Sequence, residues 1–316
     1  MDINLVFENP LKDCDLQSNV PNIAITEECI IGIDEAGRGP VLGPMVYSLA
    51  YFPLRDEKDL KKLDFADSKT LTEEKREDIF EKIGRNNYKN IGWLSTVLSP
   101  VTISNSMFKR SKYNLNQLSH DTAIALIRRA KHNGIQVSKV FVDTVGPADK
   151  YEAKLKSLFP DIKFKVANKA DSIYPIVSAA SVCAKVIRDR VVNNWKFIEP
   201  NMQFSREDYG SGYPGDPKTK KFLSQTMDPL FGFTSFVRFS WSTIKTILDE
   251  KAIECEWEEE EDEDKQQLKS ETTTKKISNY FNAANKVVKP IKKQKVNTFF
   301  KERNLKFFNN LSDLKF

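Results

Sequence analysis

The sequence is short of the residues on which several kinds of protein depend. Of its 316 residues only four are cysteines and two are histidines, and Cys14, Cys29, Cys183 and Cys255 form no C-x-x-C pair. This spacing argues against a disulfide scaffold or a cysteine zinc site, and it favours a reducing intracellular compartment. Two histidines are too few for a histidine-rich metal site. If the chain is an enzyme, we therefore expect carboxylates to carry its chemistry.

Long apolar runs are missing as well. No stretch reaches the roughly 18 apolar residues of a membrane-spanning helix, and the N-terminus lacks the layout of a signal peptide. The composition is 40% hydrophobic and 29% charged, which is typical of one large globular domain or two ordinary ones.

The net charge of +5 conceals an uneven distribution. Residues 254–264 carry nine acids and no base, whereas residues 265–316 carry thirteen lysines and arginines against three acids. Such blocks resist packing and usually act as interaction tails. We therefore predict a disordered, acidic-then-basic tail over residues 251–316. Its basic part suits phosphate-bearing partners, although solubility alone also explains such tails.

The apolar runs predict an α/β fold with a mixed sheet. Three runs separated by short turns indicate antiparallel strands, at 29–34, 45–52 and 91–98. Helices and short strands then alternate, which implies parallel strands joined by crossovers, over 116–132, 140–143, 149–158, 163–166 and 171–194. This body spans residues 29–250. Residues 1–28 show no clean periodicity and indicate a poorly ordered lead-in, while 216–250 predict a small helical C-terminal subdomain.

Acidic residues stand at the ends of these predicted elements. Asp34 and Glu35 end the first strand, Asp143 ends the strand at 140–143, and Asp171 starts the next helix. In an α/β sheet such positions gather at one edge, and carboxylates without His or Cys suit Mg²⁺ or Mn²⁺. Two such ions about 4 Å apart can hold the attacking water and the leaving oxygen of a phosphodiester. The alternative is a set of ordinary loop acids, with Asp171 as a helix cap.

Two glycine-rich segments stand near these acids or further along the chain. Gly37-Arg38-Gly39 lets the backbone come close to whatever the acids hold, because glycine has no side chain to obstruct it; the alternative is a plain tight turn. The segment G-S-G-Y-P-G-D-P is too rich in turn residues for regular structure. It is predicted to fix Tyr213 on a loop, where the ring can stack on a sugar or base. The alternative is a tyrosine packed beneath the loop.

The helix predicted from Asp171 has two distinct faces. A core stripe at helical spacing comprises Ile176, Ala180, Cys183 and Ile187. A second stripe of hydroxyl and basic residues comprises Tyr174, Ser178, Ser181, Lys185 and Arg188. The second stripe suits a phosphate backbone running along the helix, and a solvated face is the alternative.

Taken in order, these segments resemble a known family. I-G-I-D-E-A-G-R-G-P, F-V-D-T-V-G-P, K-A-D-S-I-Y-P-I-V-S-A-A-S-V-C-A-K-V-I-R-D and G-S-G-Y-P-G-D-P are similar to the type 2 ribonucleases H, over roughly residues 29–250. The segments at 113–123 and 237–241 resemble the catalytic chain of its eukaryotic, three-subunit members. The resemblance implies an RNase H-like fold and a hydrolase of RNA paired with DNA. It also implies cleavage 5′ of a single ribonucleotide embedded in DNA, leaving 3′-hydroxyl and 5′-phosphate ends, with roles in ribonucleotide excision, RNA primer removal and replication.

The resemblance also assigns roles to residues. It implies that Asp34, Glu35, Asp143 and Asp171 bind the metal ions, Mg²⁺ or Mn²⁺, of which we expect two. Gly37, Arg38 and Gly39 match the motif that reads the ribose 2′-hydroxyl, largely through backbone. Tyr213 matches the tyrosine that stacks at the RNA–DNA junction, and Lys69 a contact to substrate phosphate. Lys185 and Arg188 are further candidates for phosphate contacts.

The tail holds two short segments similar to the box with which proteins bind the sliding clamp, PCNA. Each places an aliphatic residue three before an aromatic pair: Ile277, Tyr280 and Phe281, then Val296, Phe299 and Phe300. The usual first glutamine is replaced by Thr274 and Lys293. The alternative is docking on the two non-catalytic subunits that the resemblance implies. The basic run 289–295 matches a nuclear import signal, so a nuclear location is expected.

The sequence argues against two functions other than that of a nuclease. A catalytically silent adaptor on the same fold is opposed by the complete set of acids. A resolvase or transposase of the wider superfamily is opposed by the G-R-G and G-S-G-Y segments.

Overall fold

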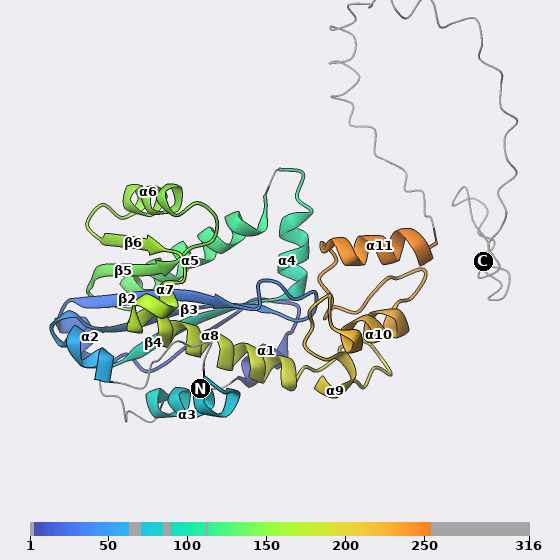
Figure 1. Ribbon diagram of the computed structural model, residues 1–316, viewed down its shortest axis with the longest axis horizontal. Coiled ribbons are helices and arrows are strands. Elements are labelled where there is room, and N and C mark those ends of the chain that lie inside the picture. Colours follow the sequence, from blue (N-terminus) through green and yellow to red (C-terminus); the bar gives the residue numbers. More distant parts are fainter. Residues whose placement is uncertain (1–2, 63–70, 85–89, 112, 254–316) are drawn as a thin grey trace, which may run out of the picture. The chain divides into compact units, whose positions relative to one another are not determined.

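A six-stranded mixed sheet forms the centre of the fold. The computed structural model describes residues 3–62, 71–84, 90–111 and 113–253, and Met1–Ala252 make up one compact unit. The strands lie in the spatial order β1-β4-β3-β2-β5-β6 (Figure 1). Their bounds are β1 Cys14–Gln17, β2 Cys29–Ala36, β3 Met45–Pro53, β4 Gly92–Leu98, β5 Val137–Asp143 and β6 Lys163–Ala167.

Antiparallel and parallel pairing are divided between the two halves of the sheet. β1 pairs with β4, β4 with β3 and β3 with β2, all antiparallel. β5 then adds to β2, and β6 adds to β5, both in parallel. The predicted α/β fold, an antiparallel meander followed by parallel additions, is confirmed.

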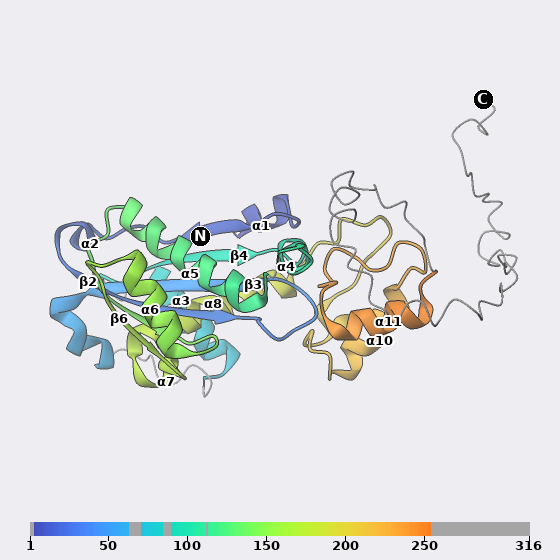
Figure 2. The same cartoon turned by 90° about the horizontal axis from the view of Figure 1, so that it is seen from above.

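Helices cover both faces of this sheet. α5 and α6 lie on one face, and α3 and α8 lie on the other (Figures 1 and 2). The helical bounds are α1 Asn4–Glu8, α2 Asn22–Thr26, α3 Glu73–Gly84, α4 Pro100–Met107, α5 Leu115–His132, α6 Ala148–Leu158, α7 Ala170–Ile173, α8 Pro175–Asn193, α9 Arg206–Tyr209, α10 Pro217–Thr226 and α11 Ser242–Lys251, with a 3-10 helix at Leu54–Lys62.

Each face of the sheet has its own hydrophobic core. Because successive side chains of a strand point to opposite faces, Ile30 of β2 packs into the core beneath α8, whereas Ile31 and Ile33 pack into the core beneath α5. The same alternation carries on along β2. Asp34 is therefore directed toward the α8 face, and Glu35 toward the α5 face.

The long helix predicted over 171–194 is two helices in the structure. α7 ends at Ile173 and α8 begins at Pro175, while Tyr174 between them is extended, with φ −115° and ψ 112°. The physical reason is that proline disfavours helical geometry in the residue before it. α8 then packs directly on β2, since a Cβ added at Gly32 would lie 2.3 Å from the Ile176 carbonyl oxygen.

The N-terminal region differs from its prediction. A poorly ordered lead-in is predicted over residues 1–28, yet Cys14–Gln17 form the edge strand β1, paired with β4. Only Leu16 of that strand is buried. A four-residue strand with one buried side chain is too short to show an alternating pattern, which is why the sequence does not reveal it.

The segment predicted to be a helical subdomain contains two helices and an irregular stretch. α10 falls within 216–250, α11 runs one residue beyond it to Lys251, and no helix lies between them over 227–241. None of the helices in the described residues is both long and apolar enough to cross a membrane. The predicted tail, apart from residues 251–253, lies outside the described residues.

Candidate active site

Asp34 and Glu35 are neighbours in β2, but their side chains are directed toward opposite faces of the sheet. Asp34 is 5% exposed and accepts a hydrogen bond from Ser181 of α8. Glu35 stands directly opposite Tyr47 of β3 in the antiparallel register. The strand runs on to Ala36, so both acids lie inside the strand and not at its end as expected. Strand pairing therefore fixes the backbone of both carboxylates.

Asp143 and Asp171 join this pair from the parallel half of the sheet. Asp143 is the last residue of β5, and the pairing of Ile33 with Val142 places it next to Asp34 in register. Its Oδ1 accepts a hydrogen bond of 2.9 Å from the N–H of Ala170, the first residue of α7. Asp171 follows at once and is buried. The structure thus brings all four acids to one edge of the sheet.

These carboxylates disfavour one another's ionised forms. Burial, followed by the charge of Glu35, raises the pKa of Asp34 well above its usual range. Burial, and then the charges of Asp143 and Asp171, raise the pKa of Glu35 to about 7, although Arg38 opposes the shift. Like charges held close in a low-dielectric environment have this effect. The cluster is therefore electrostatically unfavourable without a cation.

The donor set fits a hard divalent cation. It offers carboxylate oxygens, which Mg²⁺ and Mn²⁺ prefer, and the Oε2 atom of Glu35 is buried without a hydrogen-bond partner. In the described ranges, no three acid, histidine or cysteine side chains already converge as a finished ligand group. The unpartnered oxygen and the mutual repulsion are both features that a bound cation would relieve. Asp34, Glu35, Asp143 and Asp171 are the residues that would hold it.

The glycine loop, residues 37–39, directly follows the acids of β2. Gly37 has φ +82°, a conformation that favours glycine. A Cβ at this position would lie 2.1 Å from Nε of Arg188 and 2.8 Å from the Pro44 carbonyl oxygen. Position 37 therefore requires glycine both for its backbone angle and for the space that Arg188 occupies.

Two residues near the end of the described chain hold the carbonyl groups of the glycine loop. Arg238 is fully buried, and its Nη2 and Nη1 donate to the carbonyls of Gly37 and Arg38 at 2.7 and 3.2 Å. Trp241 donates from Nε1 to the carbonyl of Gly39 at 3.1 Å, and the Arg238 guanidinium stacks over its ring. Sequence reasoning missed both roles. The only signal is the family-like segment 237–241.

The loop's amide groups, in contrast, are left available. Within the described residues, the N–H groups of Arg38 and Gly39 donate no backbone hydrogen bond. The guanidinium of Arg38 is directed into α5, where it donates to Ser119 at 2.7 Å and to Asn116. The loop therefore presents backbone, and not the Arg38 side chain alone, to its surroundings.

Tyr213 lies on a rigid loop and against the glycine loop. Gly210 and Gly212 adopt φ of +65° and +79°, and the Asp216 carboxylate accepts hydrogen bonds from the Ser211 N–H and hydroxyl at 2.8 and 2.6 Å. Tyr213 is 50% exposed. A Cβ on Gly39 would meet its ring at 3.0 Å. The loop thus holds the ring in the open, as the turn residues predict, and not beneath the loop.

One cleft brings together seven of the predicted residues, but of the four acids only Glu35 lines it, and Asp34, Asp143 and Asp171 do not. It has a volume of about 470 Å³ and is lined by Glu35, Ala36, Gly37, Arg38, Gly39, Arg76, Lys185, Arg188, Asp189 and Tyr213. Ala36, Arg76 and Asp189 are the members that sequence reasoning did not single out. Two carboxylates, the glycine loop, an aromatic ring and several basic side chains therefore line one space.

The predicted phosphate-facing stripe of α8 is only partly correct. Ser178 and Ser181 are buried, not exposed along a groove, because α8 packs tightly against β2 at Gly32. Ser181 instead supports Asp34. Lys185 and Arg188, further along the helix, do line the cleft.

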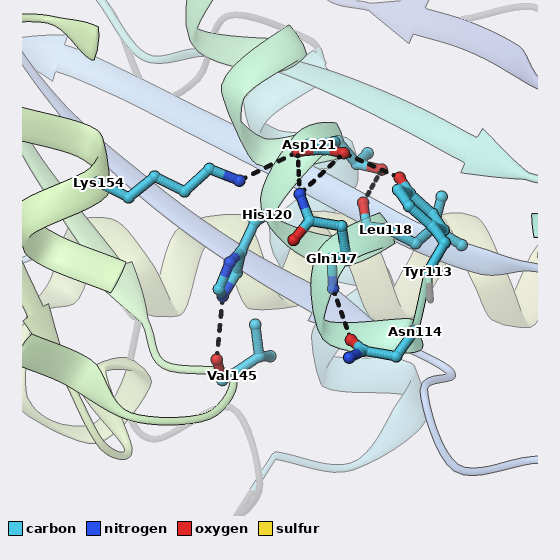
Figure 3. Close-up of polar contacts among 9 residues, drawn as sticks. Tyr113, Asn114, Gln117, Leu118, His120, Asp121, Val145 and Lys154 are labelled. Atoms are coloured by element: carbon cyan, nitrogen blue, oxygen red, sulfur yellow. Dashed lines mark hydrogen bonds and ion pairs between the residues drawn. The ribbon is translucent and has the colours of Figure 1, made fainter. Parts of the chain in front are cut away.

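The first turns of α5 brace the site from the other face (Figure 3). Nε2 of His120 lies 3.1 Å from the carbonyl of Val145, two residues beyond Asp143, and its ring stacks on Tyr151 with centroids 3.8 Å apart. Asp121 accepts hydrogen bonds from Lys154 of α6 at 3.1 Å and from Tyr113 at 2.9 Å. Together with the Arg38 contacts, this helix holds the loops that follow β2 and β5. Burial lowers the pKa of His120, so the ring is suited to a neutral, structural role.

Some predicted residues lie outside the described part of the chain. Lys69 is one of them. The two clamp-box-like segments of the tail are the others, with residues Ile277, Tyr280, Phe281, Val296, Phe299 and Phe300.

Known proteins are similar in sequence to most of this chain. A family model described as Ribonuclease HII matches residues 31–244. The A subunit of ribonuclease H2 from Mus musculus is 48% identical over 311 residues, covering 98% of this chain and 100% of that protein. The Arabidopsis thaliana protein of the same name is 48% identical over 233 residues, covering 74% and 77%. Similarity thus extends well beyond the short motifs.

Solved structures agree with the sequence relatives. The ribonuclease H2 from Pyrococcus horikoshii OT3 is 29% identical, with a TM-score of 0.56, and covers 70% of this chain and 98% of that one. A structure of the PCNA:RNase HII complex from Archaeoglobus fulgidus gives 30% identity and a TM-score of 0.50, covering 62% and 85%. This chain, with its mixed sheet and flanking helices, matches the fold of the Pyrococcus horikoshii enzyme, which confirms the predicted fold class.

Proposed function

This chain belongs to the ribonuclease HII family and is a ribonuclease H, an endonuclease acting on RNA–DNA, and on that premise we propose its finer specificity. The enzyme hydrolyses the RNA strand of RNA–DNA hybrids, and it also nicks duplex DNA on the 5′ side of a single embedded ribonucleotide. The products carry 3′-hydroxyl and 5′-phosphate ends. Such cuts start the excision of ribonucleotides and of RNA primers during DNA replication and repair.

The observation that carries this proposal is the state of the glycine loop. Its carbonyls are engaged by Arg238 and Trp241, while the N–H groups of Arg38 and Gly39 make no backbone hydrogen bond among described residues. Backbone donors pointed at a strand can test for a ribose 2′-hydroxyl without reading a base. Sequence preference is therefore expected to be weak.

Tyr213 adds the second element of specificity. Its ring is exposed and lies against Gly39, so a sugar bound at the glycine loop can also stack on the tyrosine. Two contacts to one nucleotide are enough to select a single ribonucleotide. A binding site that had to sense several consecutive ribonucleotides would need contacts along a longer groove.

The four acids supply the reaction centre in this proposal. When bound, two Mg²⁺ or Mn²⁺ ions would activate the attacking water and stabilise the leaving 3′-oxygen. Asp34 and Glu35 approach from the two faces of β2, and Asp143 and Asp171 approach from the neighbouring strand and α7. Three of these carboxylates lie on paired strands and the fourth on α7, and together they fix where the scissile phosphate must lie. The glycine loop begins two residues after Glu35, which places 2′-hydroxyl recognition beside the bond to be cut.

The names of the relatives support partner subunits for this chain. We infer that it works with two non-catalytic subunits, since its relatives are named as one subunit of ribonuclease H2, and that it works in the nucleus, for which the basic run 289–295 is the support. An archaeal family member has been solved in complex with PCNA, and the clamp-box-like segments of the tail are consistent with the same partner. Replacing Tyr280, Phe281, Phe299 and Phe300 by Ala should abolish capture of the chain by immobilised clamp. Undiminished capture would show that the two clamp-box-like segments do not bind the clamp.

Cleavage of a labelled duplex with one ribonucleotide tests the central claim. The chain is assayed alone and with co-expressed partner subunits, in Mg²⁺ and in EDTA. We expect a metal-dependent nick 5′ of the ribonucleotide and none in an all-DNA duplex. Cleavage of a long hybrid without cleavage of the single-ribonucleotide duplex would overturn the finer specificity but leave the family activity intact.

A further inference from the structure

The wall of the cleft formed by α3 and α8 carries a concentration of positive charge. Four basic side chains line the cleft, Arg38, Arg76, Lys185 and Arg188, against the two carboxylates Glu35 and Asp189. Arg38 is engaged with α5. The remaining three bases come from α3 and α8. A positively charged wall is unexpected beside a cation-binding site, unless an anion other than the carboxylates binds to it.

Arg188 is built into this wall with one hydrogen-bonding group unused. Its side chain is 8% exposed, and Nε donates to the Pro44 carbonyl at 3.3 Å. Nη1 lies 4.0 Å from Asp189, whereas Nη2 is buried and has no hydrogen-bond partner. A buried guanidinium nitrogen without an acceptor is costly. Because Arg188 lines the cleft, an acceptor bound there would satisfy it.

Arg76 reaches the same place from another helix. Nη1 donates to the Leu71 carbonyl at 2.7 Å, and Nη2 lies 3.6 Å from Asp189. Its Nε is buried and also lacks a partner. Asp189 thus lies within ion-pairing distance of Arg76 and Arg188 and holds the two guanidinium groups as neighbours.

The position of this pair relative to the glycine loop defines its ligand. Nε of Arg188 occupies the space where Gly37 would carry a side chain, and Arg188 also interacts electrostatically with Tyr213. An anion held by the two arginines would therefore be adjacent to the nucleotide that contacts both the glycine loop and Tyr213. On a nucleic acid, the anion next to a sugar is a backbone phosphate.

We infer that Arg76 and Arg188 form a phosphate-binding subsite that holds one backbone phosphate of the ribonucleotide-containing strand, next to the sugar that contacts Tyr213. This inference rests on the proposed function and extends it to Arg76, a residue that neither the motifs nor the family resemblance singled out. The subsite fixes the register of the strand, so that the ribonucleotide and not its neighbour meets the glycine loop. It contributes to positioning and takes no part in bond breaking.

The test measures binding without catalysis. A fluorescent duplex with one ribonucleotide is titrated in EDTA over a series of salt concentrations, with the wild-type chain, Arg76→Gln and Arg190→Gln. Glutamine keeps a hydrogen-bond donor and removes the charge. Arg190 is the matched control: it belongs to α8 and pairs with Glu77 of α3, but it does not line the cleft. Thermal melting checks that each variant is folded.

We expect Arg76→Gln to weaken binding about tenfold, because a charge-assisted hydrogen bond is lost. The slope of log affinity against log salt should fall by about one. A scan in which each phosphate in turn becomes a neutral methylphosphonate then identifies the contact. At one position the methylphosphonate should weaken duplex binding by the wild type and by Arg190→Gln. It should not change binding by Arg76→Gln.

Two results would overturn the inference. One is wild-type affinity and salt slope in Arg76→Gln, and the other is a methylphosphonate profile identical for Arg76→Gln and the wild type. Should Arg76→Gln fail to fold, Arg76→Lys replaces it: the salt slope should be retained because the charge is, the affinity should fall because lysine lacks the guanidinium fork, and wild-type affinity would overturn the inference. Failure of the proposed function is separate, since the wild type would then bind the ribonucleotide-containing duplex no better than all-DNA duplex.

Discussion

The carboxylate cluster and the glycine loop are adjacent in the chain but are stabilised in opposite ways. The cluster gathers acids from β2, β5 and α7, and burial with mutual repulsion raises the pKa values of Asp34 and Glu35. The glycine loop is three consecutive residues whose carbonyls are held by Arg238 and Trp241, about 200 positions away. In the cluster the Oε2 atom of Glu35 is left without a hydrogen-bond partner, whereas the carbonyl groups of the loop are satisfied and fixed in place. Cleavage at the carboxylate cluster therefore depends on a bound cation, whereas recognition of the ribonucleotide by the glycine loop does not.

Removing one carboxylate charge from the cluster should show most clearly that the cluster and the glycine loop have different roles. Asp34→Asn is expected to reduce cleavage by about a thousandfold or more, since a lost metal ligand forfeits several kcal/mol of charge stabilisation. Hybrid binding should be retained and the metal-free melting temperature should rise, because one repelling carboxylate is gone. Cleavage assays, binding titrations and melting curves measure the three effects. Asp149→Asn, an exposed acid of α6, is the control, and normal turnover by Asp34→Asn would remove Asp34 from the reaction centre.

Removing the support of the glycine loop should act on stability instead. Arg238→Met leaves three carbonyl groups without this donor, those of Gly37, Arg38 and Gly43. We expect a loss of roughly 3 kcal/mol in the free energy of unfolding, at about 1 kcal/mol for each unsatisfied group. Urea denaturation measures it, with exposed Arg128→Met as the control. An unchanged unfolding free energy would show that the loop holds its shape without Arg238.

Removing the stacking ring should change specificity more than total activity. Tyr213→Ala is expected to slow cleavage at a single ribonucleotide about tenfold or more, because the sugar loses its stacking contact, and the comparable stacking of a base on an aromatic ring contributes about 1–3 kcal/mol. Long hybrids, which make more contacts, should be affected less, and Tyr213→Phe should show a smaller loss. Phe231→Ala removes an aromatic that is 81% exposed and lies outside the cleft, and it serves as the control. Equal losses on both substrates would remove Tyr213 from junction recognition.

The electrostatic contrast also predicts a pH dependence of stability. The pKa of Glu35 is raised from 4.5 to about 7 in the folded chain, so its contribution to stability is fully present below about pH 4.5 and is lost as pH rises toward 7. In EDTA the melting temperature should fall by a few degrees over this window. Glu35→Gln should flatten the curve, because it cannot ionise. A wild-type curve identical to that of Glu35→Gln would show that repulsion at this site is negligible.

The parts of the site that depend on local pattern could be predicted from the sequence. Apolar runs located five strands and their pairing sense, because buried strands keep a recognisable pattern whatever their partners are. The glycine loop and the Tyr213 loop follow from backbone requirements that only a few residues meet. The break before Pro175 is equally local, since it follows from the geometry of the preceding residue, but the helical stripe that continues across it conceals it.

Other parts depend on distant contacts that a single pattern does not contain. Arg238 is an arginine in an irregular segment, and nothing nearby in the chain indicates that it is buried against Gly37 and Arg38. Ser178 and Ser181 form a polar stripe that predicts an accessible face, but α8 is covered on that side too. Periodicity reports which residues share a face, not what covers the face.

The extended residue Tyr174 has a consequence for the time scale on which the site can rearrange. It separates Asp171 from the nineteen-residue helix α8 and leaves it on α7, a helix of four residues. A single turn has little helical stability of its own, and such segments open locally at far lower free energy than a packed core. Amide protons of α7 should therefore exchange with solvent well before those of α8. Three of the four acids belong to strands of the central sheet, and we expect the fourth, on α7, to be the one that adjusts within the lifetime of the native state.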